Sequence, residues 1–239
     1  MRSEQRTSSI CLLLGVAACL GNALYALGEP GSALKVWSPA LVASSMIAFL
    51  FVHGGACYGG RRMVTFVVTV FLIGWLFETV SVVTGFPFGN YHYTDAMEPF
   101  VGHVPISVMP AYGVMGYASW SMARIFANRY AASADVRVRV VVPVIAAALM
   151  VVWDLSMDPL RASVEQRWIW IDGGDHLGVP IENYFGWGLV TWIMFQVFAL
   201  ALPRQDNPGN TPAPNAAFWF SVPLIYAAFA VEYLLNPVV

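Results

Sequence analysis

Two aspartates stand four residues apart in the segment VVWDLSMDPL (151–160), which closes an apolar run that begins at Val138. At a spacing of i and i+4, Asp154 and Asp158 share one face of a helix. Two like charges so close together repel, and in a medium of low dielectric one of the two carboxyls is expected to keep its proton at neutral pH. Such a pair offers a strong general acid beside a potential base.

Three further acidic residues fall in or beside apolar runs. Glu78 lies inside the run FLIGWLFETVSVV, which has no basic residue, and Glu182 and Glu232 lie near the ends of two later runs. An ionisable side chain is expensive inside a membrane, so each of them is a candidate functional residue. Simpler alternatives stay open. Glu78 could bond a Ser or Asn of another helix, Asp158 with Pro159 could end its helix in water, and Glu182 and Glu232 could be interfacial.

The apolar runs themselves are long enough to cross a bilayer. Hydrophobic residues make up 58% of the 239-residue chain and charged residues 11%, well outside the usual balance of soluble proteins. A membrane-crossing helix needs about 20 apolar residues. The runs are continuous rather than alternating, so they indicate helices and not a barrel. We predict an all-α integral membrane protein with one domain (1–239), whose seven transmembrane helices lie at about 8–28, 38–57, 63–84, 104–126, 138–157, 181–202 and 216–235.

The basic residues predict the orientation of these helices, because arginine and lysine favour the cytoplasmic side. Nine arginines flank the loops on the side of the N-terminus, whereas Lys35, Arg161 and Arg167 flank the others. We therefore expect the N-terminus in the cytoplasm and the C-terminus outside, with the long loops 85–103 and 158–180 on the outer side. The first run resembles a signal peptide, but it is long enough to span and its cleavage site is poor, so we expect it to be retained.

This topology brings the acids to one level of the membrane. A helix rises about 1.5 Å per residue, so Glu78 and Asp154 differ in depth by only a few ångströms. We predict one site, open toward the outer side, to which separate helices deliver their carboxyls. Aromatic residues gather on the same side, either as an interfacial belt or as a wall that holds a polyene and stabilises a carbocation. The aromatic candidates are Tyr91, Tyr93, Trp75, Trp153, Trp170 and Trp187.

Two classes of membrane protein fit the residues poorly. A retinal protein needs an intramembrane lysine, and the only lysine, Lys35, lies in a loop. A membrane di-iron oxygenase needs clustered histidines, but the four histidines form no HxxxH or HxxH box. His92, His103 and His176 all lie in outer loops and could meet to hold a metal together with Asp or Glu, although surface histidines are the commoner case.

The sequence has few of the residues that binding of a diphosphate, a nucleotide or a nucleic acid would require. A prenyltransferase would need basic groups for a diphosphate beside its acidic motif, and only Arg161, Arg167 and the distant Lys35 lie on that side of the membrane. No nucleotide motif is present, and no basic tract suggests nucleic acid. The expected partners are the lipid bilayer and a hydrophobic substrate, and we expect no cofactor.

Three blocks of sequence resemble the carotenoid biosynthesis family of membrane hydratases, whose members act as bisanhydrobacterioruberin or γ-carotene hydratases. The blocks have the order and spacing of that family and together span residues 78–187, about half of the chain. They are Glu78 followed by FPFGNYHYT (86–94), DLSMDP (154–159), and WIW (168–170) followed by GVPIENYFGW (178–187).

The resemblance implies a helical fold of seven or eight spans in a bacterial or archaeal cell membrane, and chemistry on isoprenoid double bonds. It points to Glu78, Tyr91, Tyr93, Asp154, Asp158 and Asn183 as site residues, and we add His176 and Glu182 from the last block as candidates for substrate binding. One departure stands before GVP, where Asp175, His176 and Leu177 replace an expected Tyr-Tyr-Gly run. Because this block is expected to line the pocket, the substrate or the outcome of the reaction could differ.

The acids and the resemblance together predict acid-initiated alkene chemistry. Asp154 or Asp158 would protonate a terminal trisubstituted double bond, and Glu78 would orient or deprotonate a water that adds to the tertiary cation. Asn183 and the tyrosines would hold the water or orient the acids. If the pocket excludes water, an internal double bond captures the cation instead, and the protein is a terpene or carotenoid cyclase. A third alternative is a non-catalytic carotenoid or lipid carrier or a transporter, whose carboxyls relay protons or serve in packing.

Overall fold

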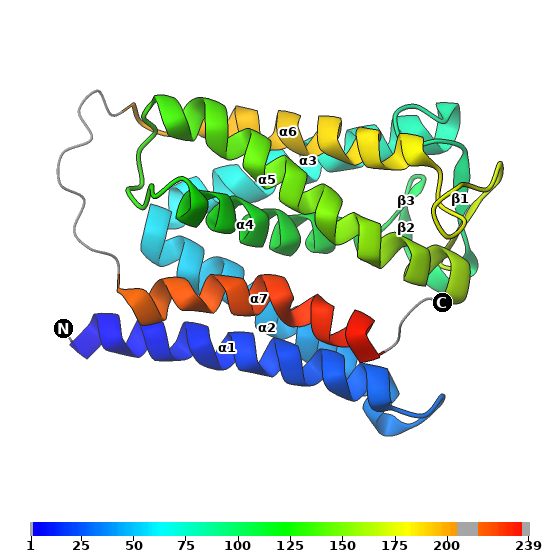
Figure 1. Cartoon of the computed structure of the whole chain (residues 1–239), viewed down its shortest axis with the longest axis horizontal. Helices are drawn as coiled ribbons and strands as arrows, with labels where there is room; N and C mark the ends of the chain where they lie inside the picture. The colour runs from blue at the N-terminus through cyan, green and yellow to red at the C-terminus, as the bar shows by residue number, and fades with distance from the viewer. Residues whose placement is uncertain (1, 205–214, 236–239) are drawn as a thin grey trace.

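A computed structural model describes residues 2–204 and 215–235 of the chain, and over these ranges the protein is a bundle of seven α-helices (Figure 1). The predicted fold class, an all-α bundle of about seven membrane helices, is confirmed. The helices are α1 (Arg2–Leu27), α2 (Ala33–Tyr58), α3 (Gly60–Thr84), α4 (Val108–Phe126), α5 (Val136–Asp158), α6 (Ile181–Ala201) and α7 (Ala216–Leu235).

Several helices extend past the ranges expected from apolar residues alone. Helix α2 begins at Ala33 rather than near 38, because Ser32 caps it and its side chain accepts a hydrogen bond from the Lys35 backbone N–H (3.3 Å). Helix α1 begins at Arg2 rather than near 8. Backbone hydrogen bonding continues through polar residues at a helix end, so hydropathy marks the apolar part of each helix rather than its bounds.

Helix α4 lies in the middle of the bundle, between a layer of α3, α5 and α6 and a layer of α1, α2 and α7 (Figure 1). Six of the described helices are long and apolar enough to cross a membrane, and α4 is not among them. Its sequence mixes Gly, Ser and Tyr with apolar residues, and every residue from Met115 to Arg124 is buried. Its surface therefore meets other helices on nearly all sides, and it needs little of the apolar surface that faces lipid.

The helical path of α5 does not stop at Asp158. Pro159 has no backbone N–H to donate to the preceding turn, and the chain continues as a π-helical segment, η2 (Pro159–Val164), with a hydrogen bond from the Glu165 N–H to the Leu160 carbonyl (3.0 Å). Asp158 is therefore buried within the bundle. The alternative that Asp158 with Pro159 ends the helix in water is wrong, and the loop expected to start at 158 begins only after η2.

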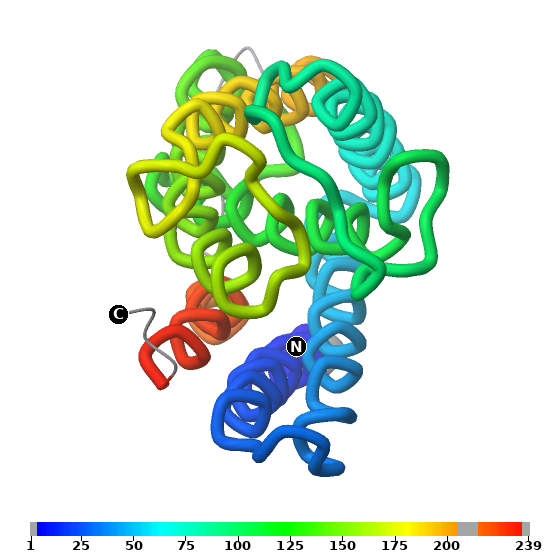
Figure 2. Tube along the Cα trace, turned by 90° about the vertical axis from the view of Figure 1, so that its right-hand side faces the viewer, coloured from blue at the N-terminus to red at the C-terminus, as the bar shows by residue number. Residues whose placement is uncertain are grey.

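The two long loops lie at the same end of the bundle, which we call the loop end and define by residues 85–107 and 165–180 (Figures 1 and 2). They contain short strands that form two antiparallel pairs, β1 with β4 and β2 with β3. The elements are β1 (Tyr91–Tyr93), a 3-10 turn η1 (Asp95–Met97), β2 (Phe100–Val101), β3 (Val104–Pro105) and β4 (Trp168–Trp170).

The pairing of β1 with β4 joins the two loops and sets which side chains face the bundle. Tyr91 lies opposite Trp170, and Tyr93 lies opposite Trp168. Side chains alternate between the two faces of a strand, so the central residues His92 and Ile169 point outward and are exposed. The tyrosines and tryptophans of both strands are turned toward the helices.

Candidate functional site

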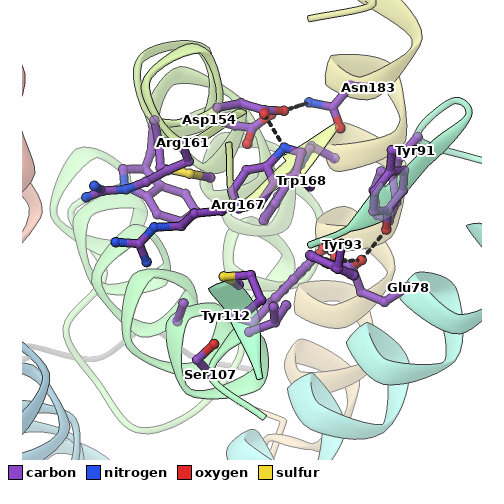
Figure 3. A pocket seen from close by; sticks show the side chains of 18 of the residues that line it. Glu78, Tyr91, Tyr93, Ser107, Tyr112, Asp154, Arg161, Arg167, Trp168 and Asn183 are labelled. Atoms are coloured by element: carbon purple, nitrogen blue, oxygen red, sulfur yellow. Dashed lines mark hydrogen bonds between the residues drawn. The ribbon is translucent and has the colours of Figure 1, made fainter. Parts of the chain in front are cut away.

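A cavity of about 210 Å³ lies at the loop end, enclosed by five helices and by the β1–β4 pair (Figure 3). Glu78 reaches it from α3, and Asp154 and Asp158 reach it from α5. All three carboxyls are buried. The three acids expected to act in catalysis therefore surround one cavity. The residues from α4, α6 and α7 that line it are Val108, Ala111, Tyr112, Asn183, Trp187 and Phe229.

Asn183 joins the two aspartates. Its amide group donates one hydrogen bond to Asp154 Oδ2 (2.7 Å) and another to Asp158 Oδ2 (2.6 Å), which uses both of its N–H groups. Asn183 lies in the first turn of α6, where its own backbone N–H donates to the Pro180 carbonyl (3.1 Å). The aspartates, one turn apart on α5, thus point the same way, as their spacing predicts.

The two aspartates differ at their second oxygen. Asp158 Oδ1 accepts hydrogen bonds from the indole N–H groups of Trp168 (2.7 Å) and Trp170 (3.4 Å). Asp154 Oδ1 is buried and accepts none from the residues that the structure describes. A buried polar atom without a partner is uncommon in native proteins. At the wall of a cavity, Asp154 Oδ1 is the carboxyl oxygen that is free to contact a bound molecule.

Glu78 is held by three tyrosines (Figure 3). Tyr91 and Tyr93 donate to its Oε2 atom (2.5 and 2.8 Å), and Tyr112 donates to its Oε1 atom (2.7 Å). Burial and the nearby Glu78 carboxylate raise the pKa of Tyr91 and of Tyr93 well above the usual value, so both hydroxyls keep their protons and remain donors. The partners of Glu78 are thus tyrosines rather than the Ser or Asn considered from the sequence.

Tyr112 is a site residue that the sequence reasoning missed. It stands in α4, whose polar and small residues could have indicated a helix surrounded by others. In such a helix, a tyrosine near the level of Glu78 points into the bundle and needs a partner for its hydroxyl. Its ring also stacks on Trp187, with centroids 4.6 Å apart and an interplanar angle of 11°.

Aromatic rings form much of the cavity wall. Trp153 meets Trp187 edge to face, with centroids 5.8 Å apart, and Phe88 lies 6.1 Å from Trp187 on another side. Of the aromatic candidates from the sequence, Tyr91, Tyr93, Trp153, Trp170 and Trp187 all line the cavity. For these residues the arrangement is a wall around the cavity rather than a belt facing the membrane surface. Their π faces border the same space as the acids.

A network of ion pairs lies on the cavity side of η2 and ties it to α7 and α1. Arg161 pairs with Glu232 (2.8 Å) and with Glu165 (2.5 Å), and Arg167 pairs with Glu165 (2.6 Å). Tyr25 donates to Glu165 as well (2.8 Å). Burial alone would raise the pKa of Glu165, but Arg161 and Arg167 outweigh it and lower the pKa. Glu232 is fully buried in this network, so its interpretation as an interfacial residue is wrong.

Three candidate substrate-binding residues do not line the cavity. Trp75 is 38% exposed, and its indole N–H donates to the Val101 carbonyl (3.2 Å). His176 bonds through Nδ1 to the Tyr184 hydroxyl (2.6 Å). Glu182 is exposed in the first turn of α6, where it lines a separate pocket of about 500 Å³. The expectation that these three contact a substrate in the same chamber as the acids is not supported by their positions.

The departure from the family pattern before GVP also lies outside the cavity. Asp175, His176 and Leu177 are absent from its lining residues, and Leu177 is exposed with a positive φ of 52°. The expectation that this block lines the pocket is therefore wrong, because the chain turns away from the cavity between Trp170 and α6.

The described residues include no group of three or more His, Cys, Asp or Glu side chains that could hold a metal ion. His92, His103 and His176 belong to that part of the chain, so they do not assemble the metal site considered from the sequence.

The comparisons with known proteins give one match. A family model described as carotenoid biosynthesis protein matches residues 35–238. This range runs from α2 through α7 and contains every residue that lines the cavity. Neither the curated proteins nor the solved structures contain a match to the chain.

Proposed function

Because the chain belongs to the carotenoid biosynthesis protein family, we propose that it is a membrane enzyme that adds water to a terminal C=C bond of a linear carotenoid or related isoprenoid. One observation carries the proposal. Asp154, with its unpartnered oxygen, and Glu78, with its three tyrosine donors, line the same buried cavity inside a wall of aromatic rings.

The proton donor in this proposal is Asp154. Its Oδ1 atom is the free carboxyl oxygen at the cavity, and it gives a proton to the less substituted carbon of the terminal double bond. Asp158 accepts N–H bonds from Asn183, Trp168 and Trp170 and stays in place as the neighbouring carboxylate. After the transfer, the Asn183 amide stabilises the negative charge left on Asp154, because it already donates to Oδ2.

The tertiary cation then lies against the π faces of the aromatic wall, in particular Trp153 and Trp187. Glu78 accepts hydrogen bonds and is fixed in orientation, so it suits the role of base. It accepts a proton from a water molecule as the new C–O bond forms, which gives a tertiary alcohol. Proton exchange with water then removes the proton from Glu78 and returns one to Asp154. The net change is the addition of one water, with no oxidant or reductant.

A cyclase that uses the same first step is the second candidate. There an internal double bond captures the cation, and a base removes a proton. The stacked aromatic wall would suit either reaction. The sequence argument for a cyclase rested on residues 175–177, and these residues do not line the cavity. A carrier would need no carboxyl oxygen at its cavity.

The reaction can be tested by expression in a lycopene-producing bacterium, with mass spectrometry of the extracted pigments. A hydratase adds the mass of one water, incorporates ¹⁸O from labelled water, and in D₂O places one deuterium on carbon. A cyclase changes retention time without changing mass. If no isoprenoid is altered, with lycopene or with shorter precursors, both enzymatic proposals fail and a carrier is favoured.

We also propose that the chain forms one domain in a bacterial or archaeal cell membrane, with the loop end on the non-cytoplasmic side. Most arginines flank the opposite end, where α3 begins and α5 begins. A cysteine introduced by His92→Cys at the exposed position of β1 should react with an impermeant maleimide in intact cells. One introduced by Arg61→Cys, at the start of α3, should react only after lysis. The reverse pattern would invert the orientation.

A further inference from the structure

A second cavity, of about 190 Å³, lies beside the first and shares part of its wall. Most of its wall comes from α1, α2, α4 and α7, and the rest comes from the residues that separate it from the acids. The two cavities have in common the lining residues Ser107, Ala111, Arg161, Arg167 and Phe229.

The second cavity reaches the outer surface of the bundle between α2 and α4. Pro39, Ala43 and Ile47 recur at every fourth position of α2, line the cavity and are exposed, whereas Val42 and Met46 beside them are buried. Residues that belong both to the lining and to the exposed surface mark an opening. Helix α2 is long and apolar enough to cross a membrane, so this opening faces lipid.

The wall shared by the two cavities, where we place the passage, suits an apolar chain rather than a charged group. Ala111, on α4, contributes only a methyl group there. Arg161 and Arg167 border it, but Glu165 and Glu232 pair with both guanidinium groups. Two positive and two negative charges cancel, which leaves no excess charge to attract a diphosphate. The stems of the arginines and the ring of Phe229 present carbon surface to the passage.

The size of the first cavity requires such a continuation. Pockets that enclose a whole drug-sized ligand measure about 300–1,000 Å³, and the cavity at the acids, at about 210 Å³, is smaller. A carotenoid is longer than a drug-sized molecule. If its terminal double bond lies at Asp154, the rest of the chain must leave the first cavity, and the second cavity adjoins the first at Ala111.

We propose that an elongated isoprenoid chain enters sideways from the lipid between α2 and α4 and lies through the second cavity, with its reacting end at Asp154. The substrate class rests on the proposed function. The far end of the chain stays in the bilayer and touches nothing in the protein. The enzyme therefore selects the reacting end and the adjacent segment, and it tolerates any far end. A substrate with two identical ends is processed in two separate binding events.

The passage can be narrowed from either side. Ala111→Phe fills the junction of the two cavities, and Ala43→Phe fills the opening on α2. Ser44→Phe is the matched control, because Ser44 is the next residue of α2, is exposed and does not line the cavity. Each protein in lipid nanodiscs is titrated with lycopene, whose polyene quenches tryptophan fluorescence, and assayed with lycopene and with a ten-carbon acyclic alkene that bears the same terminal group.

Both alanine variants should weaken lycopene binding and lower its conversion at least tenfold, and Ser44→Phe should match the wild type. Ala43 lines only the second cavity, so conversion of the short alkene by Ala43→Phe should stay within twofold. Unchanged lycopene binding in both variants would overturn the proposal, and so would an equal loss with the long and the short substrate in Ala43→Phe. If the wild type does not convert the short alkene, the lycopene-binding titration alone tests the entry route. If the wild-type protein binds lycopene but converts neither substrate, the proposed hydratase function is rejected. The lateral entry route is then tested by lycopene binding alone, through the same comparison of variants.

Discussion

Tyr91 and Trp170 face each other across the β1–β4 pair with ring centroids 5.0 Å apart, yet their polar atoms reach different carboxyls. The Tyr91 hydroxyl donates to Glu78, and the Trp170 indole N–H donates to Asp158. One pairing register therefore positions donors for both acids. A one-residue slip of either strand would turn its central residue, His92 or Ile169, toward the cavity and remove the donors that this strand supplies.

Replacement of the proposed proton donor should stop the reaction and leave binding intact. Asp154→Asn keeps the shape of the side chain and removes the acid, so conversion of lycopene should fall by about 10²–10⁴-fold, the usual share of general acid catalysis. The rate is measured in nanodiscs, and binding is measured by tryptophan quenching. Asp172→Asn, at a carboxyl that lies away from the cavity and accepts a bond from Asn90, is the control. Full activity in Asp154→Asn would refute the assignment.

Loss of one tyrosine donor should impair the capture of the cation by water more than its formation. Tyr112→Phe removes one of three hydrogen bonds to Glu78, which is about 1–1.5 kcal/mol or roughly tenfold in rate. The ratio of alcohol to isomerised alkene among the products should therefore fall. Tyr184→Phe removes a hydroxyl that bonds His176 outside the cavity, and its product ratio should stay as in the wild type. An unchanged ratio in Tyr112→Phe would remove Glu78 from the capture step.

Helix α6 packs closely against the loop before β1 at Gly186, so a larger residue there should destabilise the protein. A Cβ atom on Gly186 would lie 2.6 Å from both Phe88 Cδ1 and the Pro87 carbonyl oxygen, whereas one on Gly188 would lie 3.7 Å from Val151 Cγ2. Gly186→Ala should destabilise the protein by about 1–3 kcal/mol. Gly188→Ala should be neutral or stabilise it by up to about 1 kcal/mol, because alanine favours a helix. Thermal unfolding in detergent compares them, and equal melting temperatures would contradict the packing described.

The ion-pair network at η2 should make stability depend on pH through Glu165. Its pKa is lowered in the folded protein, because Arg161 and Arg167 outweigh the opposing effect of burial. A lowered pKa adds stability above the unfolded-chain pKa of about 4.3, and this stability is lost as the pH falls through the folded-state pKa. Glu165→Gln should therefore be less stable at pH 7 by about 1–3 kcal/mol.

The difference between Glu165→Gln and the wild type should shrink as the pH falls below about 4. Unfolding in detergent at pH 7 and at two or three acidic values measures it. Glu182→Gln is the control, because Glu182 is an exposed acid at the same end of the bundle, and its effect should be small at every pH. A constant difference across the range would mean that the charge of Glu165 contributes nothing.

Much of the architecture follows from local patterns in the chain. Continuous apolar runs predict the helices, and the spacing of Asp154 and Asp158 predicts their common direction. The partners of these acids come from elsewhere in the chain. Asn183 lies 25 residues beyond Asp158. The alternation in YHY and WIW favours strands. The residues around each segment, however, do not indicate that these two strands pair with each other.

The buried charges were harder to interpret than the helices. Glu232 near the end of an apolar run looks interfacial, because its partner Arg161 stands 71 positions away behind a proline that normally ends a helix. Only the continuation through η2 carries that arginine into the bundle. Glu182 lies in the same motif as Asn183 and His176 lies two residues before this motif, yet of these three residues only Asn183 lines the cavity.

The central position of α4 has a consequence for how the protein is made. Helix α4 is not among the helices apolar enough to cross a membrane, so it gains less than they do by leaving the translocation channel for lipid on its own. Two of its partners, α2 and α3, are synthesised before it, but α5 and α7 come later. Helix α4 is therefore expected to stay packed against α2 and α3 until α5 and α7 have been inserted around it. The cavity is complete only when the whole bundle has been synthesised.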